Sequence, residues 1–453
     1  MKHFFLSLFL TAVCGFLLSS CSGNDYVNAI PDGSTALISI DMTKMSDMAH
    51  GHENLIKNLL QIDDVKDCGI DVTSKMYLFE SADGNLGLCA KVSDKSDLND
   101  WIDKLSKNAV AQKPIERKGF TFSVLNNSWV VGFSDKALLI MGPAVGAAQA
   151  QMQLQMTKYL KADEEQGIKN SPIYDKVDSI GGSMALVAQA QALPEKMVAP
   201  FTIGAPKDAD ASQVLIAAQI DMKDGCLLID GQTFSFNKQI NQTLQEANKV
   251  YRPIQGKYVG SMPAGALMGM FVNVDGKDYI KLLQNNKGMQ ALLAGINAAV
   301  DMDNIIRSVN GDMSIIIPSY SDDNLQLSMA AQLGNKNWLG DVDYWKQSCP
   351  KGGKIVDWEK DSYYYTDGKT SFYFGVSADN QFFSGDSQQS ALSSIKSAAK
   401  QLPENVKKQI IGKRMAMLFN LSGLTSDKSE ATAVTGLLKP FFGDINAIVY
   451  SIK

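Results

Sequence analysis

The sequence predicts an α+β protein built from two tandem copies of one module, each with a mainly antiparallel sheet and helices packed on one face. Three observations predict this class. An opening motif occurs twice, strand-like and helical patterns follow it in the same order, and short turns separate successive strands. Strands joined by tight turns pair antiparallel. The apolar content of 45% and the charged content of 20% are those of a folded globular protein.

The opening motif at residues 26–33 recurs at residues 258–265, with Tyr, Val, Pro and Gly in register. In each copy an apolar run that ends in aspartate follows, at residues 36–41 and 270–275. Proline and glycine set a turn, and the run after the turn is expected to cross the core as a strand. Four more matches follow in the same order, and together they indicate a duplication. They are 83–88 with 322–327, 120–142 with 363–385, 180–185 with 411–416, and Ile216 and Ile220 with Ile448 and Ile452.

Each copy predicts the same succession of elements. The opening strand leads to an amphipathic helix, a hairpin, a short helix that Ser96 could cap, a second hairpin, a helix rich in Ala and Gln, and two closing strands. Asn126-Asn127 is the expected turn of the second hairpin in copy one. Copy one then continues into a bridging strand and a helix. The expected ranges are hairpins at 76–92, 120–141 and 314–333, helices at 96–105, 145–160, 237–250 and 390–401, and the bridging strand at 226–229.

The N-terminus predicts an export signal that ends at a lipid-modified cysteine. A short basic start precedes an apolar stretch at residues 4–18, and Leu18-Ser19-Ser20-Cys21 has the lipobox pattern of an aliphatic residue, two small residues and cysteine. We expect residues 1–20 to be removed and Cys21 to carry the acyl chains that hold the protein on the membrane. The outer membrane is the expected location. Whether the protein faces the surface or the periplasm is left open.

The lipobox followed by Tyr-Val-x-x-Ile-Pro-x-Gly and a strand ending in aspartate resembles a domain-of-unknown-function family of lipoproteins from Bacteroides and related bacteria. The resemblance covers the whole mature chain and implies a cell-envelope protein. It supplies no catalytic residue, because the motif marks the opening of a strand. The predicted organisation is a signal peptide at 1–20, a first module with its bridging strand and helix at 21–256, and a second module at 257–453.

Composition and motifs exclude several functions. A formal net charge of −5 without a basic block argues against nucleic acid as a partner. No glycine-rich phosphate-binding pattern occurs, so no cofactor is predicted. After processing His50 and His52 are the only histidines, which excludes a serine–histidine–acid triad and leaves them as weak metal candidates. The remaining cysteines could form one or two disulfides or stay as buried thiols. They are Cys68, Cys89, Cys226 and Cys349.

Aromatic residues gather in the second copy, around the run Tyr363-Tyr364-Tyr365. In a strand one of these rings must point away from the other two, so aromatic surface is expected on the sheet. Exposed rings could stack on sugar rings, although cross-strand packing explains them as well. The candidate ligand-binding residues are Trp338, Tyr344, Trp345, Trp358 and Tyr364.

Two classes of function are therefore carried forward. The first is a non-catalytic binding or scaffold protein that presents its modules to a glycan, a peptide or an envelope protein. The second is a hydrolase with a cleft between the modules, using a metal or paired carboxylates such as Asp357, Glu359 and Asp361. The duplication, the aromatic excess and the lack of nucleophile chemistry favour the first.

Overall fold

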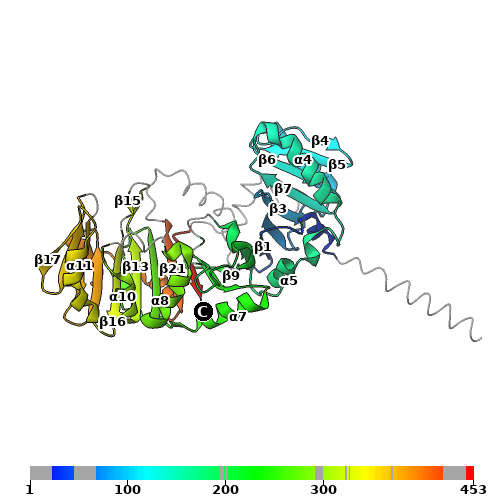
Figure 1. Cartoon of the computed structure of the whole chain (residues 1–453). Helices are drawn as coiled ribbons and strands as arrows, with labels where there is room; N and C mark the ends of the chain where they lie inside the picture. Colours follow the sequence, from blue (N-terminus) through cyan, green and yellow to red (C-terminus); the bar gives the residue numbers. More distant parts are fainter. Residues whose placement is uncertain are drawn as a thin grey trace, which may run out of the picture. The chain divides into compact units, whose positions relative to one another are not determined.

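The computed structural model describes residues 23–44, 68–193, 198, 201–290, 299–321, 324–325, 327–368, 371–421 and 445–452. Their packing divides the chain into two compact units, with the described residues up to Ser179 in the first and those from Ile180 in the second (Figure 1). Both units combine helices with a mostly antiparallel sheet, so the α+β class is confirmed. Within the described residues no helix has both the length and the apolar character needed to cross a membrane.

The sheet of the first unit has the strand order β1-β2-β3-β7-β6-β5-β4, and every neighbouring pair is antiparallel. The predicted hairpin at 76–92 is confirmed by β2 and β3. The second predicted hairpin, at 120–141, is confirmed only for β5 and β6, because a third strand, β7, lies in the same stretch. The second turns at Asn126 and Asn127, whose φ angles of 46° and 59° are left-handed, a conformation that asparagine tolerates. The strands are β1 (Ala36–Ile40), β2 (Met76–Glu80), β3 (Leu86–Lys91), β4 (Ile115–Arg117), β5 (Phe120–Leu125), β6 (Trp129–Phe133) and β7 (Ala137–Gly142).

Helices of the first unit cover both faces of its sheet, so the prediction of helices on one face is wrong. On one face Trp101 of α3 shares a core with Val131. On the other the Met156 methyl group of α4 lies 3.0 Å from where a Cβ would stand on Gly132. Val131 and Gly132 are successive residues of β6 and point to opposite faces. The first five residues of β5 are all buried, and because they alternate between the two faces, both faces of the sheet must be packed against other elements. The helices are η1 (Asp25–Ala29), α3 (Lys95–Lys107), α4 (Gly146–Lys161), η3 (Ile168–Asn170) and α5 (Pro172–Asp178).

The start of α3 also differs from the prediction. Asp94, and not Ser96, caps the helix: its Oδ1 accepts hydrogen bonds from the backbone N–H groups of Ser96 at 2.7 Å and Asp97 at 3.1 Å. A carboxylate at this position satisfies two donors and interacts favourably with the positive end of the helix dipole. Ser96 therefore lies inside the first turn.

The sheet of the second unit has the strand order β8-β9-β10-β22-β21-β12-β13-β16-β20-β19-β18-β17. Only β10 and β22 run parallel, while the other neighbours are antiparallel. A two-residue strand, β11 (Tyr251–Arg252), also pairs with β12. The strands are β8 (Met184–Gln189), β9 (Leu215–Lys223), β10 (Cys226–Phe234), β12 (Met268–Asp275), β13 (Val309–Ile317), β16 (Ser328–Leu333), β17 (Lys354–Glu359), β18 (Ser362–Thr366), β19 (Ser371–Val376), β20 (Gln381–Gly385), β21 (Met415–Asn420) and β22 (Ala447–Ile452).

Two cores lie on the two faces of this sheet. The larger packs helices α8, α10 and α11 against one face, through side chains such as Ile280, Ile305 and Trp345. The smaller packs η6 and α13 on the other, through Val259 and Val406. The main helices are α7 (Lys238–Asn248), η6 (Val259–Ser261), α8 (Gly276–Asn285), α10 (Met302–Arg307), η7 (Asn337–Asp341), α11 (Val342–Ser348), α12 (Gln388–Ser393) and α13 (Glu404–Ile410).

The division by packing differs from the division by sequence repeat. The first unit ends at Ser179, whereas the predicted first module extends to residue 256. Strands β8 and β9 group with the second unit because β9 pairs with β10 and β10 pairs with β22. The helix expected at 390–401 is also shorter than predicted, since α12 comprises only Gln388–Ser393.

Candidate functional site

The structure places the predicted site residues in different environments. Cys21, His50 and His52 lie outside the described residues. Trp338 and Trp345 lie in the core, 0% and 5% exposed, and stack with centroids 5.7 Å apart and planes 8° apart. They are buried because α11 and η7 turn their apolar sides toward the sheet, where Trp338 also contacts Phe374. Their assignment to a ligand-binding surface is therefore wrong.

Tyr344 is 69% exposed on α11, next to the buried Trp345. Its ring makes no aromatic contact among the described residues, so it stands apart from the clusters of the sheet. A lone exposed ring of this kind is ordinary on a protein surface.

Trp358 and Tyr364 lie together on one face of the sheet of the second unit, and Tyr373 joins them. Tyr364 of β18 pairs with Tyr373 of β19, and their rings stack with centroids 5.1 Å apart and planes 19° apart. Trp358 of β17 packs its edge against Tyr373 at 6.2 Å, and its Nε1 donates to the carbonyl of Tyr363 at 2.9 Å. All three side chains are partly exposed. We call Trp358, Tyr364 and Tyr373 the aromatic face.

Sequence reasoning selected Tyr364 but missed Tyr373. The alternation of Phe372-Tyr373-Phe374 was the available signal. Phe372 and Phe374 are buried, 9% and 0% exposed, so the residue between them must point to the other face.

A polar row borders the aromatic face. Lys354, Thr366 and Ser371 pair across β17, β18 and β19, two positions from the row that contains Tyr364 and Tyr373. Two residues along a strand return to the same face, so their side chains flank the aromatic rings. The Ser371 hydroxyl donates to Thr366 Oγ1 at 3.4 Å. The surface thus offers aromatic rings beside hydroxyl groups.

In the first unit, the position equivalent to the aromatic face is buried under a helix. There Val124 of β5 pairs with Val130 of β6, and the two side chains are 2% and 0% exposed. The 16-residue helix α4 packs on β6 and β7 on this face. In the second unit the helix after the corresponding hairpin, α12, has six residues and packs mainly on β20. A shorter helix therefore leaves larger, aromatic side chains uncovered.

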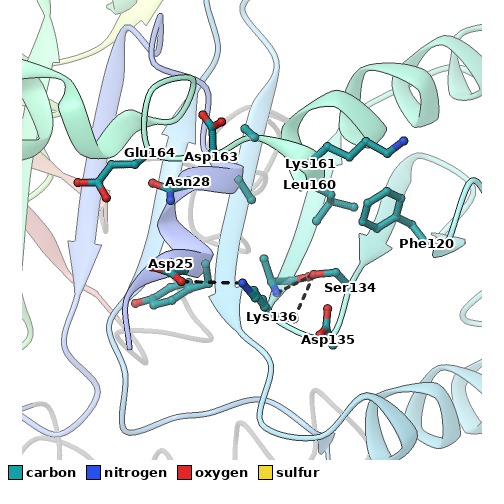
Figure 2. A pocket seen from close by; sticks show the side chains of 14 residues that line it. Asp25, Asn28, Phe120, Ser134, Asp135, Lys136, Leu160, Lys161, Asp163 and Glu164 are labelled. Atoms are coloured by element: carbon teal, nitrogen blue, oxygen red, sulfur yellow. Dashed lines mark hydrogen bonds and ion pairs between the residues drawn. The ribbon is translucent and has the colours of Figure 1, made fainter. Parts of the chain in front are cut away.

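The first unit has a polar pocket of about 560 Å³ between η1, the β6–β7 turn and the end of α4 (Figure 2). Figure 2 shows Asp163 and Glu164 on one rim and Asp135 on the opposite one. Lys136 reaches toward Asp25, with Nζ 3.8 Å from Oδ2. The pocket thus has carboxylates on several sides.

Three further groups shape this pocket. The Lys161 ammonium lies 6.0 Å from the centre of the Phe120 ring, a cation–π arrangement. The Asn28 side chain lines the wall, is 6% exposed, and its Oδ1 has no hydrogen-bond partner among the described residues. Ser134 Oγ accepts from the backbone N–H groups of Lys136 and Ala137 and so fixes the turn.

A second hollow of about 520 Å³ shares Lys161 with this pocket. Lys118 and Lys158 also line it, and neither they nor Lys161 forms an ion pair within the described part of the chain. Its one lining carboxylate, Asp83, accepts a hydrogen bond from Gln155 Nε2 at 2.8 Å. The two neighbouring hollows therefore carry opposite charge, acidic in the pocket and basic in the second hollow.

The other candidate groups, which are metal ligands, carboxylates and thiols, do not come together in one site within the described residues. In the described ranges no group of three or more His, Cys, Asp and Glu side chains is arranged to hold a metal. Asp357 is paired with Lys346 at 2.9 Å and Asp361 with Lys336 at 3.6 Å, so these acids belong to separate ion pairs. The four described cysteines are free thiols.

The fold and these sites define an α+β protein with two compact units, a charged pocket in one and a partly exposed aromatic face in the other. The family model described as "Domain of unknown function (DUF4836)" matches residues 38–421, and the chain belongs to this family. None of the curated proteins compared with the chain matches it.

Two solved structures show a distant likeness. "Structure of crystal form IV of TP0453" is 11% identical, with a TM-score of 0.30, and the match covers 48% of this chain and 82% of that one. "Structure of crystal form I of TP0453" is 10% identical, with a TM-score of 0.27, and covers 82% and 96%. Scores this low carry no argument about the fold or the function of this chain.

Proposed function

We propose that this is a lipid-anchored cell-envelope protein that binds a glycan without chemically changing it. The observation that carries the proposal is the aromatic face, where a stacked tyrosine pair and a tryptophan remain partly exposed on a sheet. Burying such rings would stabilise the fold, so leaving them uncovered favours a surface that a ligand covers. Sugar rings present flat C–H surfaces to aromatic rings and hydroxyl groups to polar side chains.

The polar row supports a glycan over an apolar peptide. Thr366 and Ser371 offer hydroxyl groups beside the rings, and Lys354 adds one positive charge. An entirely apolar partner would leave these hydroxyl groups without water, which costs free energy. A glycan would instead exchange hydrogen bonds with them while its ring stacks on Tyr364 or Tyr373.

We also propose that the chain arose from a tandem duplication. The orders β1-β2-β3-β7-β6-β5-β4 and β12-β13-β16-β20-β19-β18-β17 correspond strand by strand along the chain and across each sheet. The proline of each opening motif makes an isolated bridge at a corresponding place, Pro31 with Gly167 and Pro263 with Gln401. Met184 pairs with Ile220 as Met415 pairs with Ile452. These parallels support two diverged copies, of which the second carries the aromatic face.

The lipid anchor is part of the proposal. The lipobox that ends at Cys21 predicts acylation, and a Cys21→Ser chain should leave the membrane fraction. Protease treatment of intact cells, with a periplasmic protein as control, would then separate surface display from the periplasmic face. Cleavage on intact cells would place the ligand outside the cell.

The glycan proposal is tested by titrating the mature chain with soluble envelope and host oligosaccharides while following tryptophan fluorescence. Wild-type protein is expected to bind a member of the set, and the Tyr364→Ala/Tyr373→Ala variant to bind it at least about tenfold more weakly, a change of about 1.4 kcal/mol. Tyr344→Ala is the matched control, because this tyrosine is exposed and outside the aromatic face. Unchanged affinity in the double variant, or no binding of any member at about 1 mM, would refute the proposal.

A further inference from the structure

We infer that the pocket of Figure 2 and the basic hollow beside it together bind a phosphoethanolamine group, with its ammonium in the pocket and its phosphate on the lysines. Lys161 lines both hollows, so the two charge environments adjoin. The inference rests on the proposed lipid anchor only for the source of the group, which is the membrane. The charges and donors that would recognise the group all come from side chains of the first unit.

The pocket favours a cation that carries N–H donors. Four carboxylates line it against two ammonium groups, so its lining is acidic. Asp135 forms no ion pair among the described residues, and Asn28 Oδ1 is a buried acceptor without a donor. Buried polar atoms normally have partners, so this orphan indicates a missing donor. The ammonium groups of Lys136 and Lys161 already lie beside Asp25 and Phe120, which shows that the lining accommodates such charges.

The basic hollow favours an anion. Lys158 and Lys161 stand three residues apart on α4, where like charges repel. Lysines in the last turn of a helix interact favourably with the negative end of the helix dipole, and this interaction is by itself enough to explain Lys158 and Lys161. Lys118 has no such explanation, because it comes from the β4–β5 turn and still lines the same hollow. A phosphate would supply the counter-charge that the three ammonium groups lack.

The pocket lies close to the predicted lipid attachment. Asp25 follows Cys21 by four residues, and four extended residues span at most about 14 Å. Whatever path those residues take, the Asp25 side of the pocket stays within reach of the lipid headgroups once Cys21 is acylated. Headgroup binding would then hold the first unit against the membrane surface.

Phosphoethanolamine should be preferred over phosphocholine. Both groups carry one phosphate and one positive charge, so the lysines do not distinguish them. The quaternary ammonium of choline has no N–H group and cannot donate to Asn28 Oδ1 or to the carboxylates. Selectivity between the two therefore reports on the acidic pocket.

The test uses the mature chain with Cys21→Ser, so that binding is measured without an acyl chain. Glycerophosphoethanolamine and glycerophosphocholine are titrated by isothermal calorimetry, and the first is expected to bind with a Kd of about 1 mM. We expect the second to bind at least about fivefold more weakly. The Asp135→Asn/Lys118→Gln variant should lose at least about tenfold in affinity. Asp100→Asn/Lys107→Gln, which changes one acid and one lysine on α3 outside both hollows, is the matched control.

Each outcome has a defined meaning. No binding, equal binding of the two compounds, or equal losses in the two double variants overturns the inference. Binding of the soluble compound together with enrichment on phosphatidylethanolamine vesicles over phosphatidylcholine vesicles supports a membrane source. Binding without that enrichment keeps the site and assigns it a soluble phosphoethanolamine compound. Mass spectrometry of the wild-type N-terminus reports acylation separately, so failure of the anchor is not confused with failure of the pocket.

Discussion

Tyr364 stacks on Tyr373 at the position where the first unit pairs Val124 with Val130. The two valines are buried, whereas the two tyrosines are partly exposed. A strand pairing at a similar place in the two sheets is thus core in the first unit and partly exposed surface in the second. This contrast allows the contribution of the rings to stability to be separated from their contribution to binding.

Replacing both tyrosines by the cross-strand pair of the first unit, Tyr364→Val/Tyr373→Val, should change stability little. A cross-strand aromatic pair contributes roughly 0.2–1 kcal/mol, and valine keeps a high strand propensity. We expect the free energy of unfolding, measured in urea, to fall by about 1 kcal/mol or less. A loss above about 3 kcal/mol would mean that the aromatic face is a core element and not a binding surface.

Trp338→Ala should behave in the opposite way. This side chain is fully buried and contacts Trp345, Phe374 and Phe382, so its removal opens a large cavity. The expected loss is about 3–5 kcal/mol. Tyr344→Ala, on the same helix region but exposed, should stay within about 0.5 kcal/mol of wild type in the same urea titration. Similar losses in the two variants would contradict the packing of α11 and η7 described above.

Asp312→Ala should destabilise the second unit. This carboxylate is 2% exposed and accepts from the backbone N–H groups of Gln255 and Lys257, at 3.0 and 2.8 Å. It also accepts from Asn273 Nδ2 at 2.9 Å. Removing it leaves the two backbone N–H groups without an acceptor and leaves Asn273 Nδ2 with only the carbonyl of Pro253. A single buried orphan costs about 1–3 kcal/mol. We expect a loss of about 3 kcal/mol or more, against almost none for Asp386→Ala at an exposed site.

Asp71 should make the first unit sensitive to acid. Partial burial acts to raise the pKa of Asp71, but hydrogen bonds from Thr73, Lys91 and Ser74 outweigh it and hold the pKa well below its usual range. A lowered folded-state pKa gives stability that is present above the unfolded value of about 3.9. That stability is lost as pH falls below about 4 toward the folded-state pKa.

The variant Asp71→Asn tests this contribution. Its stability deficit relative to wild type should be full near pH 7 and should shrink as pH falls below about 4. Urea unfolding at a series of pH values, followed through the tryptophans of the first unit, measures the deficit. A deficit that stays the same from neutral to acid pH would show that the carboxylate charge is not what stabilises the turn.

Cys349 should be the first described cysteine to react with a thiol reagent under native conditions. It is partly exposed, while Cys68, Cys89 and Cys226 are buried. Burial raises the pKa of the Cys349 thiol, so its alkylation rate should keep rising above about pH 8.5, the usual midpoint. Mass spectrometry after brief iodoacetamide treatment identifies the modified residue. Earlier labelling of Cys89 would contradict its burial.

Local signals in the sequence predicted the hairpins well. Asn126-Asn127 turns β5 into β6, because asparagine accepts left-handed backbone angles. The structure shows a similar turn at Asp224-Gly225, between β9 and β10. The strands they join then pair antiparallel, as adjacent strands with tight turns must. The order of elements follows from such local signals in both units.

Features that depend on distant packing were not predictable in the same way. Trp338 looks like a surface ligand residue in sequence, and only the docking of η7 on β19 and β20 buries it. The parallel pairing of Cys226 with Ala447 joins residues more than 200 positions apart, and no local pattern encodes it. The length of α12 decides whether Tyr373 is covered, and helix ends are the least certain part of any sequence pattern.

The position of β22 has a consequence for how the protein is made. Strand β22 lies between β10 and β21, and within the described residues of the second unit it is the only strand that joins β8-β9-β10 to the rest of the sheet. A chain that is synthesised from its N-terminus therefore holds two incomplete sheets, with open edges on β10 and β21, until residues 447–452 are made. During that interval both edges can pair with other chains, so the time needed to synthesise residues 447–452 after β10 and β21 sets the period in which this protein is open to aggregation.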